Sequence, residues 1–269
     1  MENIYIINTH THVNMLKQTP VDDAVDDLKN QNMIGIVPSS TAEDIFEVDE
    51  FIKKYDNLYG YVGVFPEEVK GFTDKTLSDM ENIIKNNPKI IGIGEIGLDY
   101  YWDKTFIDLQ KEVFIKQIEF ANAMNLPINI HCRDAHFETL NILKEHNKNS
   151  KAIMHCFSGS YEFAKECIKE GIYISLGGVV TFKNAKKTKE VAKNIPLEYL
   201  VLETDDPYLA PVPYRGKENM PSYVKYVAEE IASLRGILPE EVAQKTTQNA
   251  LKIFPQINTN IGHDYCQEF

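Results

Sequence analysis

Cysteine, basic residues and long apolar runs are all scarce in this sequence. The four cysteines include no Cys-x-x-Cys pair and no dense framework, so they predict reduced cytosolic thiols and argue against disulfides. Lysine and arginine number 28 against 40 aspartates and glutamates, and the net charge of −12 excludes a protein that holds nucleic acid by a broadly basic surface. No run approaches the roughly 20 apolar residues that span a bilayer, and residues 1–5 lack the features of a secretory signal. We therefore expect a cytoplasmic protein with no membrane partner and no obligate protein partner.

The sequence does contain enough apolar material for a sizeable core. Of its 269 residues, 43% are hydrophobic and 25% are charged, which argues against intrinsic disorder. Short runs rich in isoleucine and valine recur without clean alternation, as expected of strands buried on both faces. These predicted strands are Tyr5–Asn8, Met33–Val37, Leu58–Val64, Ile90–Glu95, Ile128–His131, Ala152–His155, Ile172–Leu176 and Tyr199–Glu203.

Amphipathic segments lie between these runs. Apolar residues recur mostly three or four positions apart from Leu109 to Ala121, and similar stripes cover residues 45–52, 77–84 and 227–234. Pro239, followed by two glutamates, is typical of a first helical turn. Strands that alternate with helices predict a parallel sheet. Eight such units in about 250 residues match a TIM-type (β/α)8 barrel with a single domain. An open doubly wound sheet is the alternative.

Histidine and acidic residues stand at the ends of several predicted strands. In a barrel the carboxyl ends of all strands meet at one mouth, so residues far apart in sequence would converge there. The set is His10, His12, Glu95, His131, His155 and Asp205. A lone histidine at a strand end is ordinarily a hydrogen-bonded structural residue, but that explanation does not account for the whole set. The remaining histidines, His136, His146 and His263, are expected on solvated surface.

Imidazole nitrogens and carboxylate oxygens in such a set are ligands for transition metals, and the carboxylates also admit manganese or magnesium. His10 and His12 would face the same side, because alternate residues of an extended chain do. One ion would take both rings, and Glu95 would bridge to a second ion held by His131 and His155. Two ions about 3.5–4 Å apart would activate water and hold both oxygens of a displacement. The sequence thus predicts two divalent metal ions, Zn, Mn or Mg.

The segment Gly92–Gly97 fits the G-x-G-x-x-G pattern of a dinucleotide-binding turn. Glu95, however, would place a carboxylate beside the pyrophosphate of a dinucleotide. The residues that follow, 98–103, are aromatic and acidic and do not resemble the start of a helix. We expect these glycines to let the backbone turn tightly while Glu95 points into the mouth.

Four longer segments carry a family resemblance. They are Glu95-Ile96-Gly97-Leu98-Asp99-Tyr100-Tyr101, His131-Cys132-Arg133-Asp134, His155-Cys156-Phe157-Ser158-Gly159 and Glu203-Thr204-Asp205-Asp206-Pro207-Tyr208-Leu209-Ala210-Pro211. Together with His10-Thr11-His12 they resemble the TatD family of metal-dependent deoxyribonucleases. The resemblance covers Ile4 to about Phe254, and the motifs stand in the family's order.

The resemblance implies an amidohydrolase-like barrel over residues 1–255, followed by a tail of no assigned function at 256–269. It implies that the six residues named above are metal ligands, with Glu95 shared between two ions. The implied activity is that of a 3′–5′ exonuclease that hydrolyses phosphodiester bonds at an end of single-stranded DNA or RNA. Glu95 and Asp205 would be catalytic, and Asp205 would either take the proton of the attacking water or hold that water as hydroxide.

Two arginines and an aromatic run are candidate substrate contacts. Arg133 and Arg215 follow the fifth and eighth predicted strands and would pair with phosphate. The aromatic run Tyr100-Tyr101-Trp102 would stack an unpaired base. For a protein of charge −12, two divalent ions and two arginines would bind one end of a nucleic-acid strand, and few contacts would extend along a duplex.

Three positions depart from the family pattern. Asn8 stands where the family usually has aspartate, Phe65 and Glu67 replace two histidines of Gly-x-His-Pro-His, and Asp206 replaces a serine. The alternative function is a metal-dependent esterase or amidase, for example one acting on a lactone or an aminoacyl ester, because activated water attacks carbonyl carbon as readily as phosphorus. The presence of all six candidate ligands argues against a non-catalytic binding module.

Overall fold

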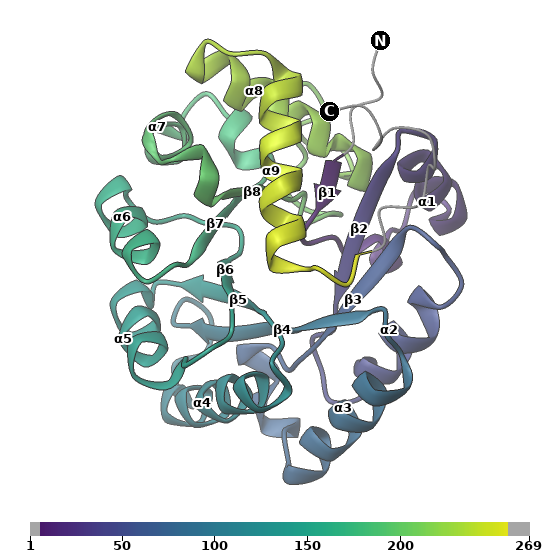
Figure 1. The fold of residues 1–269 in the computed structure, drawn as a ribbon, viewed down its shortest axis with the longest axis vertical. Helices are drawn as coiled ribbons and strands as arrows, with labels where there is room; N and C mark the ends of the chain where they lie inside the picture. The colour runs from purple at the N-terminus through teal and green to yellow at the C-terminus, as the bar shows by residue number, and fades with distance from the viewer. Residues whose placement is uncertain (1–5, 258–269) are drawn as a thin grey trace.

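The computed structural model describes residues 6–257, so Tyr5, His263 and Cys266 lie outside the described residues. Within this range, parallel strands close into a barrel in which each strand pairs with the next along the chain (Figure 1). The strands are β1 Ile6–Asn8, β2 Met33–Pro38, β3 Leu58–Val62, β4 Ile90–Asp99, β5 Ile128–Arg133, β6 Ala152–Met154, β7 Tyr173–Leu176 and β8 Leu200–Leu202. Asn8 pairs with Leu202 and closes the circle, which confirms the predicted barrel and excludes the open sheet.

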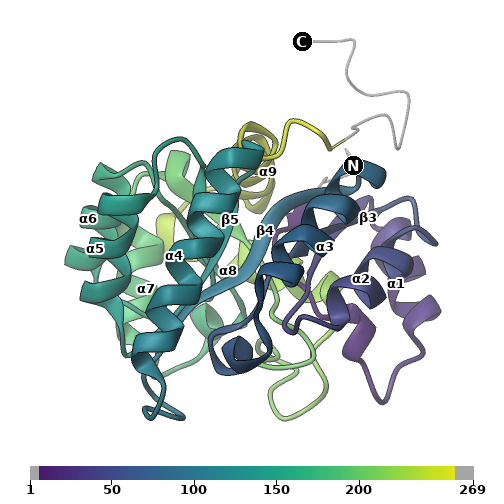
Figure 2. The same cartoon turned by 90° about the horizontal axis from the view of Figure 1, so that it is seen from below.

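Helices connect the strands and surround them (Figures 1 and 2). They are α1 Val21–Asn30, α2 Asp44–Ile52, α3 Asp74–Asn86, α4 Ile107–Met124, α5 His136–His146, α6 Tyr161–Lys169, α7 Lys186–Asn194, α8 Val224–Arg235 and α9 Pro239–Ile253. The predicted amphipathic stripes lie in α2, α3, α4 and α8, and Pro239 begins α9 as expected. Among residues 6–257, no helix has the length and apolar character needed to cross a membrane.

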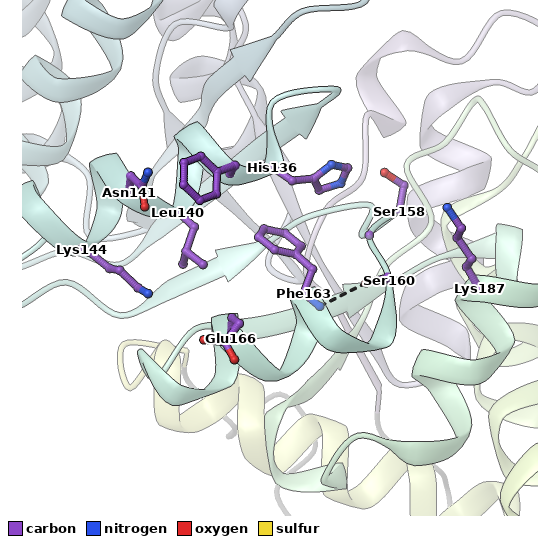
Figure 3. Close-up of a pocket in the computed structure, with 11 residues that line it drawn as sticks. His136, Leu140, Asn141, Lys144, Ser158, Ser160, Phe163, Glu166 and Lys187 are labelled. Atoms are coloured by element: carbon purple, nitrogen blue, oxygen red, sulfur yellow. Dashed lines mark hydrogen bonds between the residues drawn. The ribbon is translucent and has the colours of Figure 1, made fainter.

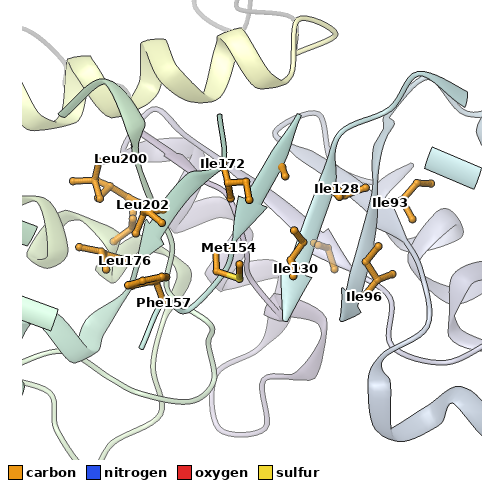
Figure 4. Close-up of a cluster of buried hydrophobic side chains, with 14 of the residues drawn as sticks. Ile93, Ile96, Ile128, Ile130, Met154, Phe157, Ile172, Leu176, Leu200 and Leu202 are labelled. Carbon is orange, nitrogen blue, oxygen red and sulfur yellow. The ribbon is translucent and has the colours of Figure 1, made fainter. Parts of the chain in front are cut away.

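The apolar residues form two layers, one outside the strands and one inside the barrel. Figure 4 shows part of the outer layer, with buried side chains on and next to β4 to β8; helix residues such as Phe114, Ala164 and Val227 belong to the same cluster. The inner layer includes Ile7, Ile34, Tyr61, Ile91, Ile153 and Val201, and it is completed by Ala250, Ile253 and Phe254 of α9. Asn249 of α9 donates to the carbonyls of Leu197 and Leu200, at the start of β8. Helix α9 therefore closes the amino end of the barrel, and the carboxyl end remains for polar groups.

Strand β4 is longer than predicted, because it continues past Glu95 to Asp99. Its register against β5 shifts between Ile93 and Ile96. A Cβ on Gly97, whose φ is +149°, would lie 1.9 Å from the carbonyl oxygen of His131, so only glycine permits this approach of the two strands. The Gly92–Gly97 motif therefore serves close packing between strands and forms no dinucleotide-binding turn.

Candidate metal centre

The six candidate ligands converge at the carboxyl end of the barrel. His10 and His12 follow β1, Glu95 lies within β4, His131 lies in β5, and His155 and Asp205 follow β6 and β8. His10, His12, Glu95 and His155 are buried, while His131 and Asp205 remain partly accessible. Residues that are distant in the chain are thus neighbours because parallel strands present their carboxyl ends together.

One group of possible ligands consists of His10, His12 and Asp205. The Nε2 atoms of the two histidines are 3.0 Å apart, so their rings face the same side as expected for alternate residues. Asp205 Oδ1 lies 3.7 Å from the Nε2 atom of each ring. Two nitrogens and one oxygen at these separations match the donor set of a zinc or manganese site.

A second group consists of His10, Glu95 and His155. Glu95 Oε2 lies 3.7 Å from His10 Nε2, and Glu95 Oε1 lies 3.1 Å from His155 Nε2. The rings of His10 and His155 are stacked with centroids 3.8 Å apart. His10 is common to both groups, whereas we expected Glu95 to be the shared residue. The bridging role of Glu95 stays a prediction.

His131 contacts Glu95 but belongs to neither group. Its Nδ1 atom lies 2.9 Å from Glu95 Oε1, and its Nε2 atom lies 2.9 Å from Asp99 Oδ2. Both ring nitrogens therefore face carboxylates. In this arrangement His131 orients Glu95, and its predicted role as a ligand stays a prediction.

Outer partners fix the orientation of the other rings, and the sequence did not single them out. His10 Nδ1 lies 2.9 Å from Asn129 Oδ1, and His155 Nδ1 lies 3.3 Å from Glu203 Oε2. Such partners of metal-binding histidines typically fix the ring and raise its basicity. Asn129 could have been found, since it precedes His131 by two positions and therefore shares its face of β5. For Glu203, the only feature of the sequence that indicated a role in the site was its position in the Glu-Thr-Asp motif.

Burial and neighbouring charge shift the pKa values of these groups in opposite directions. Burial lowers the pKa of His10 well below its usual value. Burial also opposes the charging of His155 and Glu95. It is outweighed at His155 by the carboxylates of Glu203 and Glu95, and at Glu95 by the rings of His155 and His131. The pKa of His155 is therefore well above its usual value, and that of Glu95 is well below it. Burial raises the pKa of Asp205 to about 7.

The three departures from the family pattern have clear places in the structure. Asn8 donates to Thr204 Oγ1 and to the carbonyl of Pro221, so it ties the end of β1 to the segment after β8. Asp206 is fully buried, and burial raises its pKa to about 6. Phe65 packs edge-on against His131, with ring centroids 4.7 Å apart. An apolar ring thus covers one side of His131.

The two predicted substrate arginines lie against aromatic rings. The Arg133 guanidinium is 3.8 Å from the ring centre of Tyr101 and 5.2 Å from that of Trp102. Arg215 lies 3.7 Å from the ring centre of Phe182. Within residues 6–257, neither arginine has a carboxylate within ion-pair distance. Their charge is therefore not offset by a carboxylate in this part of the chain.

The prediction that His136 lies on solvated surface is wrong. His136 begins α5 and lines a cavity of about 470 Å³ between α5 and α6, opposite Phe163 and Ser158 (Figure 3). Its ring packs against Phe163 with centroids 4.9 Å apart, and its Nε2 atom is buried. The periodicity of α5 does not reveal that α6 covers this residue. His146, at the other end of α5, lies 3.3 Å from Glu119.

Glu203→Gln tests the outer partners. The amide keeps the size of the side chain but removes the charge that faces His155 Nδ1, so we expect divalent-metal affinity to fall about 10- to 100-fold. Metal titration of the purified variant, followed by calorimetry, measures the change. Unchanged affinity would show that Glu203 does not act on His155.

Comparison with known proteins agrees with this geometry. The family model described as TatD related DNase matches residues 7–255. The uncharacterized metal-dependent hydrolase YabD of Bacillus subtilis is 45% identical over 252 residues, covering 93% of this chain and 98% of that protein. The uncharacterized metal-dependent hydrolase YcfH of Escherichia coli is 34% identical over 257 residues, covering 93% and 96%. The crystal structure of YJJV, a TatD homolog from Escherichia coli, has a TM-score of 0.86 at 29% identity and covers 93% of this chain and 98% of that one. The chain belongs to the TatD family of metal-dependent hydrolases.

Proposed function

We propose that this metal-dependent hydrolase is a 3′–5′ exonuclease that acts on the end of single-stranded DNA or RNA. One observation carries the proposal: a cluster of groups that could hold metal lies at the same end of the barrel as Arg133 and Arg215, two arginines with no carboxylate partner among residues 6–257. A guanidinium group pairs with phosphate through two parallel hydrogen bonds. The combination suits a phosphodiester better than a neutral substrate.

The donor set fits divalent ions. The donors of the groups His10–His12–Asp205 and His10–Glu95–His155 lie within 4.8 Å of one another within each group. Because the single lone pair of His10 Nε2 can bind only one ion, His10 would serve one ion and the remaining donors of the other group would hold the second. A bound divalent ion supplies Lewis acidity, which lowers the pKa of water toward about 7 and offsets charge on phosphate oxygens. Zinc and manganese suit this mixture of imidazole and carboxylate.

The chain's own residues orient the reacting groups and hold the proton. Asn129 and Glu203 fix the rings of His10 and His155, so their Nε2 atoms point into the centre. Burial raises the pKa of Asp205 to about 7, so a carboxylate oxygen of Asp205 that is not bound to an ion could take up a proton near neutral pH. Arg133, beside the exposed rings of Tyr101 and Trp102, would bind the phosphate next to a stacked base.

A specific observation also favours the alternative, hydrolysis of a carboxylic ester or amide. Phe65 packs on His131 where the family pattern has a histidine, so an apolar ring stands in place of a polar one beside His131. An apolar ring suits an acyl group better than a phosphate. Esterase or amidase activity is therefore the second candidate.

A direct assay separates the two functions. Protein supplied with Mn²⁺, Mg²⁺ or Zn²⁺ is expected to shorten 5′-labelled single-stranded DNA stepwise from its 3′ end, and chelator is expected to stop the reaction. The products are resolved on a denaturing gel, with RNA, a blunt duplex and a panel of lactones and esters in parallel. Turnover of esters with no cleavage of either nucleic acid would replace the proposal by the alternative.

A further inference from the structure

One part of this acidic protein carries only positive charge. Between Glu170 and Glu190 the sequence has no aspartate or glutamate. The loop after β7 and the first turn of α7 in this interval present three exposed lysines, and Arg215 lies beside them over Phe182. We call these four cations the basic ridge: Lys183, Lys186, Lys187 and Arg215.

The ridge cations have no counter-charge, a property that they share with Lys193 and Lys252 but not with many other helix lysines of residues 6–257. Lys75 and Lys85, for example, each pair with an acidic residue four positions away. In residues 6–257, no carboxylate lies within ion-pair distance of a ridge cation, and the next lysine of α7, Lys189, is already paired with Glu230. Unpaired like charges repel one another, so this cluster would be stabilised by an external anion.

The loop that carries Lys183 begins next to the candidate metal centre. The loop after β7 begins at Gly177, where a Cβ would lie 3.4 Å from the side chain of Glu203, the partner of His155. Farther along this loop, Thr181 accepts a hydrogen bond of 2.8 Å from the backbone of Val212, in the segment that follows Asp205. The loop that carries Lys183 therefore starts beside the centre, at the same end of the barrel.

Two hollows flank the ridge. The cavity of about 470 Å³ in Figure 3 places Lys187 near Ser158 and His136, with the ring of Phe163 beside them. On the other side, a cavity of about 540 Å³ is lined by Lys183, Arg215 and Phe182, among other residues. Cations beside aromatic side chains are the surface that unpaired nucleotides require, because the phosphates need charge and the bases need stacking partners.

We propose that the basic ridge binds the backbone phosphates of a single nucleic-acid strand beyond the nucleotide held at the metal centre. The inference rests on the proposed nuclease function and extends it, because the substrate then has a charged path along the surface in addition to the contact at its end. The −12 charge of the chain repels a polyanion elsewhere. The ridge thus determines the direction in which the strand leaves the centre.

The test compares two triple variants with the same change of charge. Lys183→Ala/Lys186→Ala/Lys187→Ala removes three ridge cations. Lys54→Ala/Lys193→Ala/Lys252→Ala removes three exposed lysines at or just beyond the carboxyl ends of α2, α7 and α9, and Lys193 lies on the same helix as two ridge residues. Binding of fluorescein-labelled (dT)12 to the full chain is measured by anisotropy in chelator, so that cleavage does not interfere.

We expect the ridge variant to bind (dT)12 at least about tenfold more weakly than wild type, and the control variant to bind nearly as wild type. Each single-strand phosphate contact adds about 0.7 to the slope of log affinity against log salt, so the loss of three lowers that slope by about 2. Equal affinity and equal slope for the two variants would overturn the proposal.

Binding and cleavage are measured separately, so the two proposals can fail separately. If metal-loaded wild type cuts no phosphodiester but the ridge variant alone loses (dT)12 affinity, the nuclease proposal fails and the ridge stands. If wild type cuts (dT)12 while both variants bind it equally, the ridge fails and the nuclease stands. Circular dichroism confirms that both variants, altered only at exposed lysines, retain the fold.

Discussion

Glu95→Ala is expected to abolish hydrolysis and to reduce the metal content of the purified protein. Its carboxylate lies within 3.7 Å of ring nitrogens of three histidines. Its loss therefore removes one donor of the group His10–Glu95–His155 and a contact of His10, the residue common to both groups. Loss of an outer partner of a metal site typically costs about 10- to 100-fold in metal affinity or activity. We expect the loss of Glu95 to exceed that range, as measured by turnover and by elemental analysis of bound metal.

Two controls keep this result interpretable. Glu95→Gln preserves the volume of the buried side chain, so a similar loss of metal in that variant shows that the charge is required. Asp49→Asn alters a different buried carboxylate, which contacts Lys53 and Asn87 away from the mouth, and should retain metal and turnover. Full activity with unchanged metal content in Glu95→Ala would refute the assignment of Glu95 to the centre.

Gly97→Ala is expected to have the largest effect on stability. Its Cβ would lie 1.9 Å from the carbonyl oxygen of His131, and this neighbour is backbone that cannot rotate away. Overpacking typically costs about 1–3 kcal/mol, and a side chain in an unfavourable backbone region adds about 1–3 kcal/mol. We expect the free energy of unfolding to fall by at least about 3 kcal/mol, as measured by urea denaturation.

Two other glycines allow the destabilisation caused by the steric clash to be distinguished from that caused by the backbone conformation. Gly171 has a positive φ of 74° but open space around its Cβ position, so Gly171→Ala should cost only about 1–2 kcal/mol. Gly71 has open space and no positive φ, so Gly71→Ala should change stability by less than about 1 kcal/mol. A Gly97→Ala variant as stable as Gly171→Ala would mean that β4 and β5 can move apart.

The positions of the strands could be predicted because strands that are buried on both faces consist largely of isoleucine and valine. The end of β4 could not be predicted. The strand continues through Gly97 and Leu98 to Asp99 because it closely approaches and pairs with β5 there. That approach depends on contacts between segments distant in sequence. The sequence of β4 alone does not indicate these long-range contacts.

Sequence motifs indicated which residues would converge at the mouth, but they did not indicate the roles within it. The pairing of His131 with Asp99, and the place of His10 in both ligand groups, depend on side-chain directions across four strands. The stacking of Arg215 on Phe182 joins the loops after β7 and β8, whose proximity follows only from closure of the barrel.

The inner layer of the barrel also constrains how the chain folds during synthesis. This layer joins Ile7 of the first strand to Ile253 and Phe254 at the end of α9. It cannot be completed until almost the entire chain has left the ribosome, and contacts of such long sequence separation slow folding. The barrel interior is therefore covered only once α9 packs against it, and until then its apolar side chains are open to association with other chains.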